Sequence, residues 1–313
     1  MNSQLRSGIE RHGVFAGLVA ISIVLFWKTI AALASYSLHQ DSSSHIVLIP
    51  FISAYLLVSE RKRIFVKNQP AIGLGILVAL VGLALYWAAA HFWSAATDGN
   101  PALSAATFSL VVTWVGLFVL SYGLVATRAA VFPLLFLLLM IPLPDRVLDK
   151  TIYLLQQGST EIAYLLFKIA GVPVLRQGFV LTVPGFSIEV ATECSGIRSS
   201  MALFITCLLA AHLFLRTSWK KVVLMLLSFP LALVKNGVRI ATLTLLSMYV
   251  NPSFLSGSLH RDGGFAFFLL ALAMILPVFL AFERSDAREF AKRDQEKTTN
   301  PLKSQTYSFV TGK

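Results

Sequence analysis

The sequence is poor in charged residues. Asp, Glu, Lys and Arg together make up 13% of its 313 residues, whereas a soluble domain typically carries roughly 25%. Hydrophobic residues make up 56%, and the mean hydropathy is +0.74. Many of the apolar residues occur in long runs, and a run of about 20 is enough to cross a bilayer. These features exclude a soluble two-domain protein and predict an integral membrane protein.

Cysteine is also scarce. Cys194 and Cys207 are the only two in the chain, so they cannot form a disulfide framework. There is no CxxC motif and no Cys/His spacing suited to zinc. Because a helix rises about 1.5 Å per residue, the two cysteines would lie about 20 Å apart and should not pair. We therefore expect no metal site and no cofactor.

Acidic residues are outnumbered by basic ones. Lys and Arg number 26 against 15 Asp and Glu, which gives a net charge of +11. In a soluble protein this surplus would suggest a nucleic-acid partner. In a membrane protein the first role of Lys and Arg is to set orientation. We therefore expect the lipid bilayer, and no nucleic acid, as the partner of these charges.

Eight apolar stretches are candidate membrane spans. They are approximately Val14–Leu38, His45–Ser59, Ile72–Phe92, Ala102–Tyr122, Ala130–Ile141, Ser199–Leu215, Val222–Ile240 (running on toward Val250) and Gly263–Phe282. Most of the basic residues fall at the N-terminus, in alternate loops and in the tail, which by the positive-inside rule places both termini in the cytoplasm. The first span could be a signal peptide, but its apolar run is long and we favour an uncleaved helix.

One segment on the outer side is long and is not itself a strong span. Residues 145–170 alternate apolar and polar side chains at helical spacing, which predicts a short helix lying at the membrane interface. Residues 178–190 predict a small β-hairpin on the outer face. The expected fold is therefore an all-α membrane protein with about eight transmembrane helices. Residues 1–285 would form one membrane domain, and 286–313 a cytoplasmic tail that is at least partly disordered.

Three residues suited to nucleophilic chemistry reach the same predicted face. Cys194 lies just before the sixth span, and His260 lies just before the eighth. If the seventh span enters from the cytoplasm at Val222, Arg239 lies about 26 Å along it, close to the outer interface. Polar groups at this depth are costly and are therefore candidates for function.

The chemistry available to this group is that of a cysteine nucleophile. A helix N-terminus and the nearby guanidinium groups of Arg198 and Arg239 would stabilise a thiolate at Cys194. Arg239 could instead bind the oxyanion of a tetrahedral intermediate, and His260 could act as general acid and base. The Ser195-Gly196 pair permits close approach of a substrate backbone.

Each of these residues also has a structural interpretation. A cysteine beside a membrane helix is often a small buried hydrophobic residue, and Cys207 fits that description. An arginine near a helix end often extends to the lipid headgroups, and a histidine in a loop is often incidental. The catalytic interpretation therefore depends on the combination of residues.

Three segments together resemble the signature regions of the exosortase/archaeosortase family of prokaryotic membrane cysteine enzymes. They are Glu-Cys-Ser-Gly-Ile-Arg at 193–198, Asn-Gly-Val-Arg-Ile at 236–240 and Leu-His-Arg-Asp-Gly-Gly-Phe at 259–265. The resemblance extends to segments 44–50, 132–136 and 140–144, in the family's order. It implies that Cys194 is the nucleophile, Arg239 the essential arginine and His260 the third catalytic residue, which points to the bacterial exosortase branch.

The resemblance implies a role in protein sorting. Family substrates are exported proteins whose C-terminal signal combines a short motif, often with Pro-Glu-Pro, a transmembrane helix and a basic tail. The chain would cleave this signal through a Cys194 thioester, at the outer face of a prokaryotic inner membrane, and transfer the protein to an acceptor that the sequence does not identify. Glu193, Asn236 and His45 are added as supporting residues.

Three other functions remain open from the sequence. A transporter would usually show repeated halves or ionisable residues at the membrane midplane, and the chain shows neither. A non-catalytic subunit of an envelope polysaccharide system would leave Cys194 inert. A serine protease would use Ser195, although the neighbouring cysteine ionises more easily.

Overall fold

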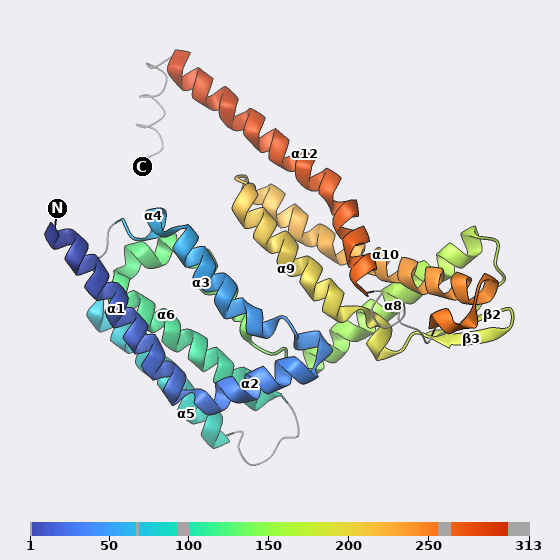
Figure 1. Ribbon diagram of the computed structural model, residues 1–313, viewed down its shortest axis with the longest axis horizontal. Helices are drawn as coiled ribbons and strands as arrows, with labels where there is room; N and C mark the ends of the chain where they lie inside the picture. The colour runs from blue at the N-terminus through green and yellow to red at the C-terminus, as the bar shows by residue number, and fades with distance from the viewer. Residues whose placement is uncertain (1, 67–68, 93–99, 256–263, 300–313) are drawn as a thin grey trace. The chain divides into compact units, whose positions relative to one another are not determined.

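The computed structural model of the protein is mostly helical and describes residues 2–66, 69–92, 100–255 and 264–299 (Figure 1). It divides into two compact units, residues 1–151 and residues 152–313, which are described separately. Within the described residues, five helices are long and apolar enough to cross a membrane. They are α5 (Ile72–Phe92), α6 (Pro101–Ala129), α9 (Ile197–Phe214), α10 (Ser218–Tyr249) and α12 (Gly264–Thr299).

Two further candidate spans are interrupted helices. The predicted first span consists of α1 (Asn2–Leu25) and α2 (Trp27–His39), which bend by 76° at their junction. The second pair combines α7 (Val131–Phe136) and its 3-10 extension η3 (Leu137–Met140) with α8 (Asp145–Ile169). If each pair is one span, the number rises to seven. The predicted second span corresponds to a shorter helix, residues 46–59, so the total of eight and the cytoplasmic termini stay predictions.

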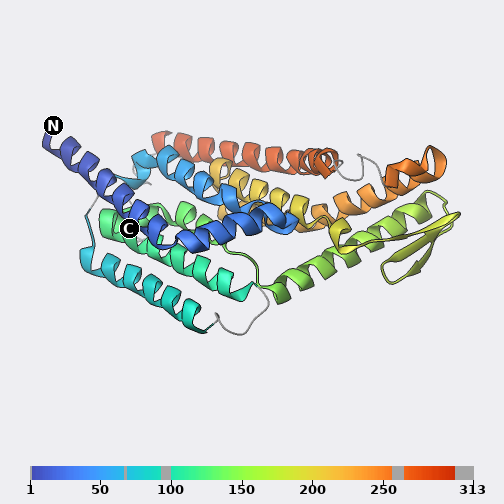
Figure 2. The same ribbon diagram turned by 60° about the horizontal axis from the view of Figure 1, so that its bottom comes forward.

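The first unit is built around close packing of α5 and α6. A Cβ placed on Gly75 would lie 2.3 Å from the Cα of Leu120, and one on Gly116 would lie 2.4 Å from the backbone nitrogen of Ala79. Small residues at a membrane-helix interface let the backbones approach closely. The two helices lie side by side in both views (Figures 1 and 2), as this close approach requires.

Besides α1, α2, α7 and η3, the described part of this unit contains four short helical segments between α2 and α5. They are the 3-10 turns η1 (Asp41–Ser43) and η2 (Ile46–Leu48), followed by α3 (Ile49–Ser59) and α4 (Arg61–Ile64). Ser53 in α3 donates a hydrogen bond of 2.7 Å to the carbonyl of Pro133 in α7. This bond satisfies a buried hydroxyl and joins the α3 segment to α7.

The close helix packing can be tested by adding one methyl group. Gly75→Ala should lower the thermal midpoint of the detergent-solubilised protein, because overpacking typically costs about 1–3 kcal/mol. Gly73→Ala is the matched control, since Gly73 lies two residues away in the same helix with nothing within 4 Å of its added Cβ. Size-exclusion chromatography after heating would measure both midpoints. Equal midpoints for the two variants would contradict the tight α5–α6 contact.

The second unit carries a small antiparallel sheet. Its strands are β1 (Leu175–Gln177), β2 (Val180–Val183) and β3 (Phe186–Glu189), in the order β1-β2-β3. The predicted hairpin therefore gains a third strand. The helix predicted over residues 145–170 is α8 (Asp145–Ile169), whereas its location at the membrane interface stays a prediction.

One face of this sheet is apolar and packs on helices. Leu181 and Val183 of β2 are buried, and they belong to a core cluster with Phe167 of α8 and with Ile240 and Ala241 of α10. Alternation along each strand leaves Ser187 and Glu189 exposed on the other face. Figure 2 shows the sheet alongside the C-terminal part of α8.

The helices α9, α10 and α12 pack together through a second apolar cluster that includes Leu203, Ala232 and Ala271. At one end of this bundle a buried ion pair joins α10 to α12, where Lys220 donates to Asp286 at 2.8 Å and to Glu289 at 3.0 Å. Asp286 also accepts bonds from the backbone N–H groups of Arg216 and Thr217. The carboxylate therefore fixes both the α9–α10 turn and α12.

The buried ion pair between Lys220 and Asp286 should contribute more to stability than the pair between Lys220 and the exposed Glu289. The Asp286 side chain is 3% exposed and that of Glu289 is 49% exposed, although both accept from the same ammonium group. Asp286→Asn should lower the thermal midpoint markedly, because it leaves Lys220 buried beside a neutral amide. Glu289→Gln should change the midpoint little, because exposed pairs contribute little. A larger loss in Glu289→Gln would show that this assignment is wrong.

Candidate active site

The chain places Cys194 on a short turn between the sheet and the first turn of α9. The Val190 N–H bonds the Phe179 carbonyl at 3.0 Å, and the Val190 carbonyl accepts from Gln156 of α8 at 2.9 Å. Cys194 then lies in a 3-10 turn, η4 (Thr192–Ser195), where its N–H bonds the Ala191 carbonyl at 2.9 Å. Hydrogen bonds therefore hold the backbone both before the turn, at Val190, and within it, at Cys194.

Gly196 makes the sharp connection from η4 to α9. Its φ of +72° lies in the left-handed region, which side chains with a Cβ rarely adopt. An added Cβ would also lie 2.7 Å from the Oδ1 atom of Asn236. The connection therefore requires glycine for two independent reasons.

Asn236 of α10 ties this turn to two helices. Its Nδ2 atom donates to the Cys194 carbonyl at 2.8 Å and to the Ser159 hydroxyl of α8 at 3.0 Å. Asn236 is 1% exposed, so both bonds form away from water, where polar groups must be paired. Within the described residues, its Oδ1 atom and the buried Ser195 hydroxyl have no hydrogen-bond partner.

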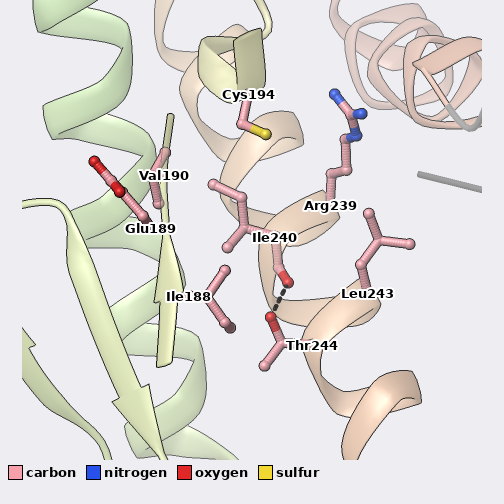
Figure 3. A pocket seen from close by; sticks show the side chains of 8 residues that line it. All are labelled: Ile188, Glu189, Val190, Cys194, Arg239, Ile240, Leu243 and Thr244. Carbon is pink, nitrogen blue, oxygen red and sulfur yellow. Dashed lines mark hydrogen bonds between the residues drawn. The ribbon is translucent and has the colours of Figure 1, made fainter. Parts of the chain in front are cut away.

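Cys194 and Arg239 line one pocket between the sheet and α10. Figure 3 shows the sulfur and the guanidinium group at the same end of it. The enclosed cavity is small, with a volume of about 50 Å³. Its walls are mainly apolar, and the other lining residues are Ile188, Glu189, Val190, Ile240, Leu243 and Thr244. A nucleophile and a cation thus share one mainly apolar pocket.

Two sources of positive charge lie near Cys194. The first N–H groups of α9 have no acceptor within their own helix, so they form a positive end just after Cys194. Arg239 adds a full positive charge at the pocket. Arg198 is exposed and is not among the residues that line this pocket. Because α9 begins at Ile197, Arg198 also does not continue a helical turn that contains Cys194.

The other predicted site residues are not all placed at this pocket. Glu193 lies in η4, and Ser195 is fully buried beneath the turn. His45 belongs to the first unit, where it lines a separate small pocket with Ser42 and Pro142. His260 lies outside the described residues.

Sequence reasoning missed part of the buried polar support. Ser159 was not singled out, although it shares Asn236 with the Cys194 turn. Lys235 is 1% exposed, and its ammonium group donates to the Ser199 hydroxyl in the first turn of α9. A lysine beside an asparagine within an apolar helix was the available signal, because such groups are costly to bury. Among the described residues, no group of three or more His, Cys, Asp or Glu side chains could hold a metal ion.

Comparison with known proteins agrees with this arrangement at the level of family. The sequence model of the transmembrane exosortase family matches residues 27–277. No curated protein and no solved structure matches the chain. Since the family match covers most of its length, the chain belongs to the transmembrane exosortase family. It is a multi-pass membrane protein, and its family is in general one of membrane cysteine proteases and transpeptidases that act on C-terminal sorting signals of exported proteins.

The pairing of Cys194 with Arg239 can be tested by thiol reactivity. In a Cys207→Ala background, Arg239→Gln should slow alkylation of Cys194 by a membrane-impermeant reagent about tenfold at neutral pH. The rate should recover as the pH rises, because alkaline solution ionises the thiol without help from a cation. Arg198→Gln is the control, and it should alkylate close to the parent rate. Equal slowing in both variants would mean that Arg239 has no special contact with the thiol.

Proposed function

We propose that the protein is a membrane cysteine transpeptidase or protease that cleaves the C-terminal sorting signal of exported proteins. The observation that carries the proposal is the shared pocket of Cys194 and Arg239, which come from different helical segments of the second unit. The family match supports the same class of substrate. The cleaved motif, with Pro-Glu-Pro as the first candidate, would enter this pocket from an adjacent transmembrane helix of the substrate.

The first half of the reaction forms a thioester. The Cys194 thiolate attacks the carbonyl carbon of the cleaved peptide bond, and Arg239 binds the oxyanion that develops. The intermediate then collapses, the C–N bond breaks, and the leaving amine takes a proton from His260. The C-terminal fragment departs with its transmembrane helix. The exported protein stays attached to the sulfur through its new C-terminal carbonyl.

The second half releases the protein. An acceptor amine or water attacks the thioester carbonyl and gives its proton to His260, and the thiolate leaves. Attack by an amine gives transpeptidation, whereas attack by water gives simple proteolysis. The acceptor must reach the same face of the pocket as the leaving group. The proposed location is the outer side of a prokaryotic inner membrane, where exported proteins arrive.

The decisive experiment is to trap the thioester. The protein would be co-expressed with an exported reporter that ends in a Pro-Glu-Pro motif, a transmembrane helix and a basic tail. Intact-mass and peptide mass spectrometry should find the reporter fragment attached to Cys194, and hydroxylamine should release it. Cys194→Ala should abolish both the adduct and the processing.

Cys207→Ala is the matched control. Cys207 is 2% exposed in the core of the α9 bundle, so its loss should leave the adduct and the processing in place. Processing that persists in Cys194→Ala would contradict the proposed nucleophile. If the reporter instead remained intact with the parent protein while another candidate signal was cut, only the motif would need revision.

A further inference from the structure

Among the residues that the structure describes, the strand β3 has one backbone edge without a partner strand. The sheet order β1-β2-β3 makes β3 an edge strand. In its antiparallel pairing with β2, Ile188 faces Leu181 and Phe186 faces Val183. The Val190 N–H bonds the Phe179 carbonyl, so by alternation Ile188 and Phe186 also direct their backbone groups toward β2. Ser187 and Glu189 must direct theirs to the other side.

These outward groups are ready to accept another strand. Within the described residues, the backbone groups of Ser187 and Glu189 make no backbone hydrogen bond outside the sheet. The Ser187 hydroxyl contacts Thr182 on the exposed face, so that side chain does not cover the edge. An unpaired strand edge is a template for an extended polypeptide.

The same strand forms a wall of the nucleophile's pocket. Ile188, Glu189 and Val190 line it together with Cys194 and Arg239. In Figure 3, β3 runs along one side of the pocket and α10 lies on the other. The enclosed volume is only about 50 Å³, well below that of a pocket that surrounds a whole ligand, so a bound chain would lie along the edge of β3 with only individual side chains entering the pocket. The outer edge of β3 and the reactive group are therefore parts of one site.

We propose that the substrate binds by adding an extended strand to the outer edge of β3. The N–H groups of Ser187 and Glu189 would donate to substrate carbonyls, and the apolar residues of the pocket would receive alternate substrate side chains. This inference rests on the proposed function and specifies how its substrate is held. Backbone pairing would also tolerate proline in the substrate, because proline keeps its carbonyl acceptor.

The proposal includes a parallel orientation for the bound substrate, since an antiparallel strand would instead pair the residues after the cleaved bond. From β3 the protein chain passes through Glu189 and Val190 to Cys194, and then enters α9. A substrate strand parallel to β3 therefore brings a peptide carbonyl to Cys194 just after the residues that pair. The paired residues are those before the cleaved bond, and the remainder of the substrate continues in the direction of α9.

A proline substitution tests the backbone donor directly. Ser187→Pro removes the outward N–H without removing a donor from the β2–β3 ladder, as edge strands allow. Ser187→Ala is the comparison, because both variants lose the hydroxyl and its contact with Thr182. The reporter of the trapping experiment is the probe, with enzyme and reporter in proteoliposomes. We expect kcat/KM for Ser187→Pro to fall about three- to tenfold below that for Ser187→Ala, mainly through KM.

Alkylation of Cys194 separates binding from damage to the turn. Ser187→Pro should alkylate at the rate of Ser187→Ala, which shows that the nucleophile is intact. Equal kcat/KM for the two variants at equal alkylation rates would overturn the inference. The proposed function would survive that result, because it depends on loss of processing in Cys194→Ala and not on residue 187.

Cross-linking gives an answer even if the proline variant fails to fold. A Cys194→Ala, Cys207→Ala, Ser187→Cys protein would be mixed with reporters that carry one cysteine at successive positions. A bis-maleimide should join residue 187 to positions just before the cleavage site and not to positions after it. Cross-links only after the site, or at no position near it, would refute the parallel strand on β3.

Discussion

The hydrogen bond from Asn236 to the Cys194 carbonyl is the contact on which the site depends. It joins the η4 turn, which carries the thiol, to α10, which carries Arg239 one turn further along. The second bond from the same amide, to Ser159, adds α8. Three segments thus meet at one buried amide, in a region where water cannot replace a lost bond. The relative position of nucleophile and cation follows from that junction.

Gly196 is the other half of this constraint. Asn236 can approach the turn only because no Cβ intervenes, and the turn can reverse only because its φ is positive. The backbone conformation and the close packing therefore explain why a glycine follows Cys194 and Ser195. The Cys194 carbonyl accepts a hydrogen bond from the side-chain amide of Asn236, and the chain turns into α9 directly afterwards. Both features require glycine two residues after the cysteine. The Ser195 side chain is fully buried in the turn, which makes Ser195 a poor rival nucleophile.

The sequence predicts the long apolar elements well and the short or bent ones less well. The helices α5, α9 and α12 begin within two residues of the predicted spans, because run length and composition decide whether a segment can cross a bilayer. The bend at Phe26 carries no proline or glycine that would mark it. The strand β1 has only three residues, too few to show alternation. Its pairing is decided by β2, which lies beyond the turn.

Some residues of the candidate site could likewise be recognised from the sequence, and others could not. Cys194 and Arg239 could be singled out from the sequence, because a thiol just before an apolar helix and a guanidinium group within one are conspicuous, and their catalytic roles stay predictions. Ser159 was not, because a serine in an amphipathic helix has many uses and only the fold brings it to Asn236. The exposed position of Arg198 was equally hidden, since it depends on the helix beginning three residues after Cys194.

The sheet supplies backbone hydrogen-bonding groups that helices do not have available. A helix satisfies its own backbone, so a bundle of helices can recognise a peptide only through side chains. An edge strand offers backbone donors and acceptors at fixed spacing, and it binds an extended chain with little regard to sequence. Placing such a strand against the pocket of Cys194 would let one enzyme hold many substrates in the same register. Discrimination would then fall to the few apolar positions along the pocket wall and to Arg239.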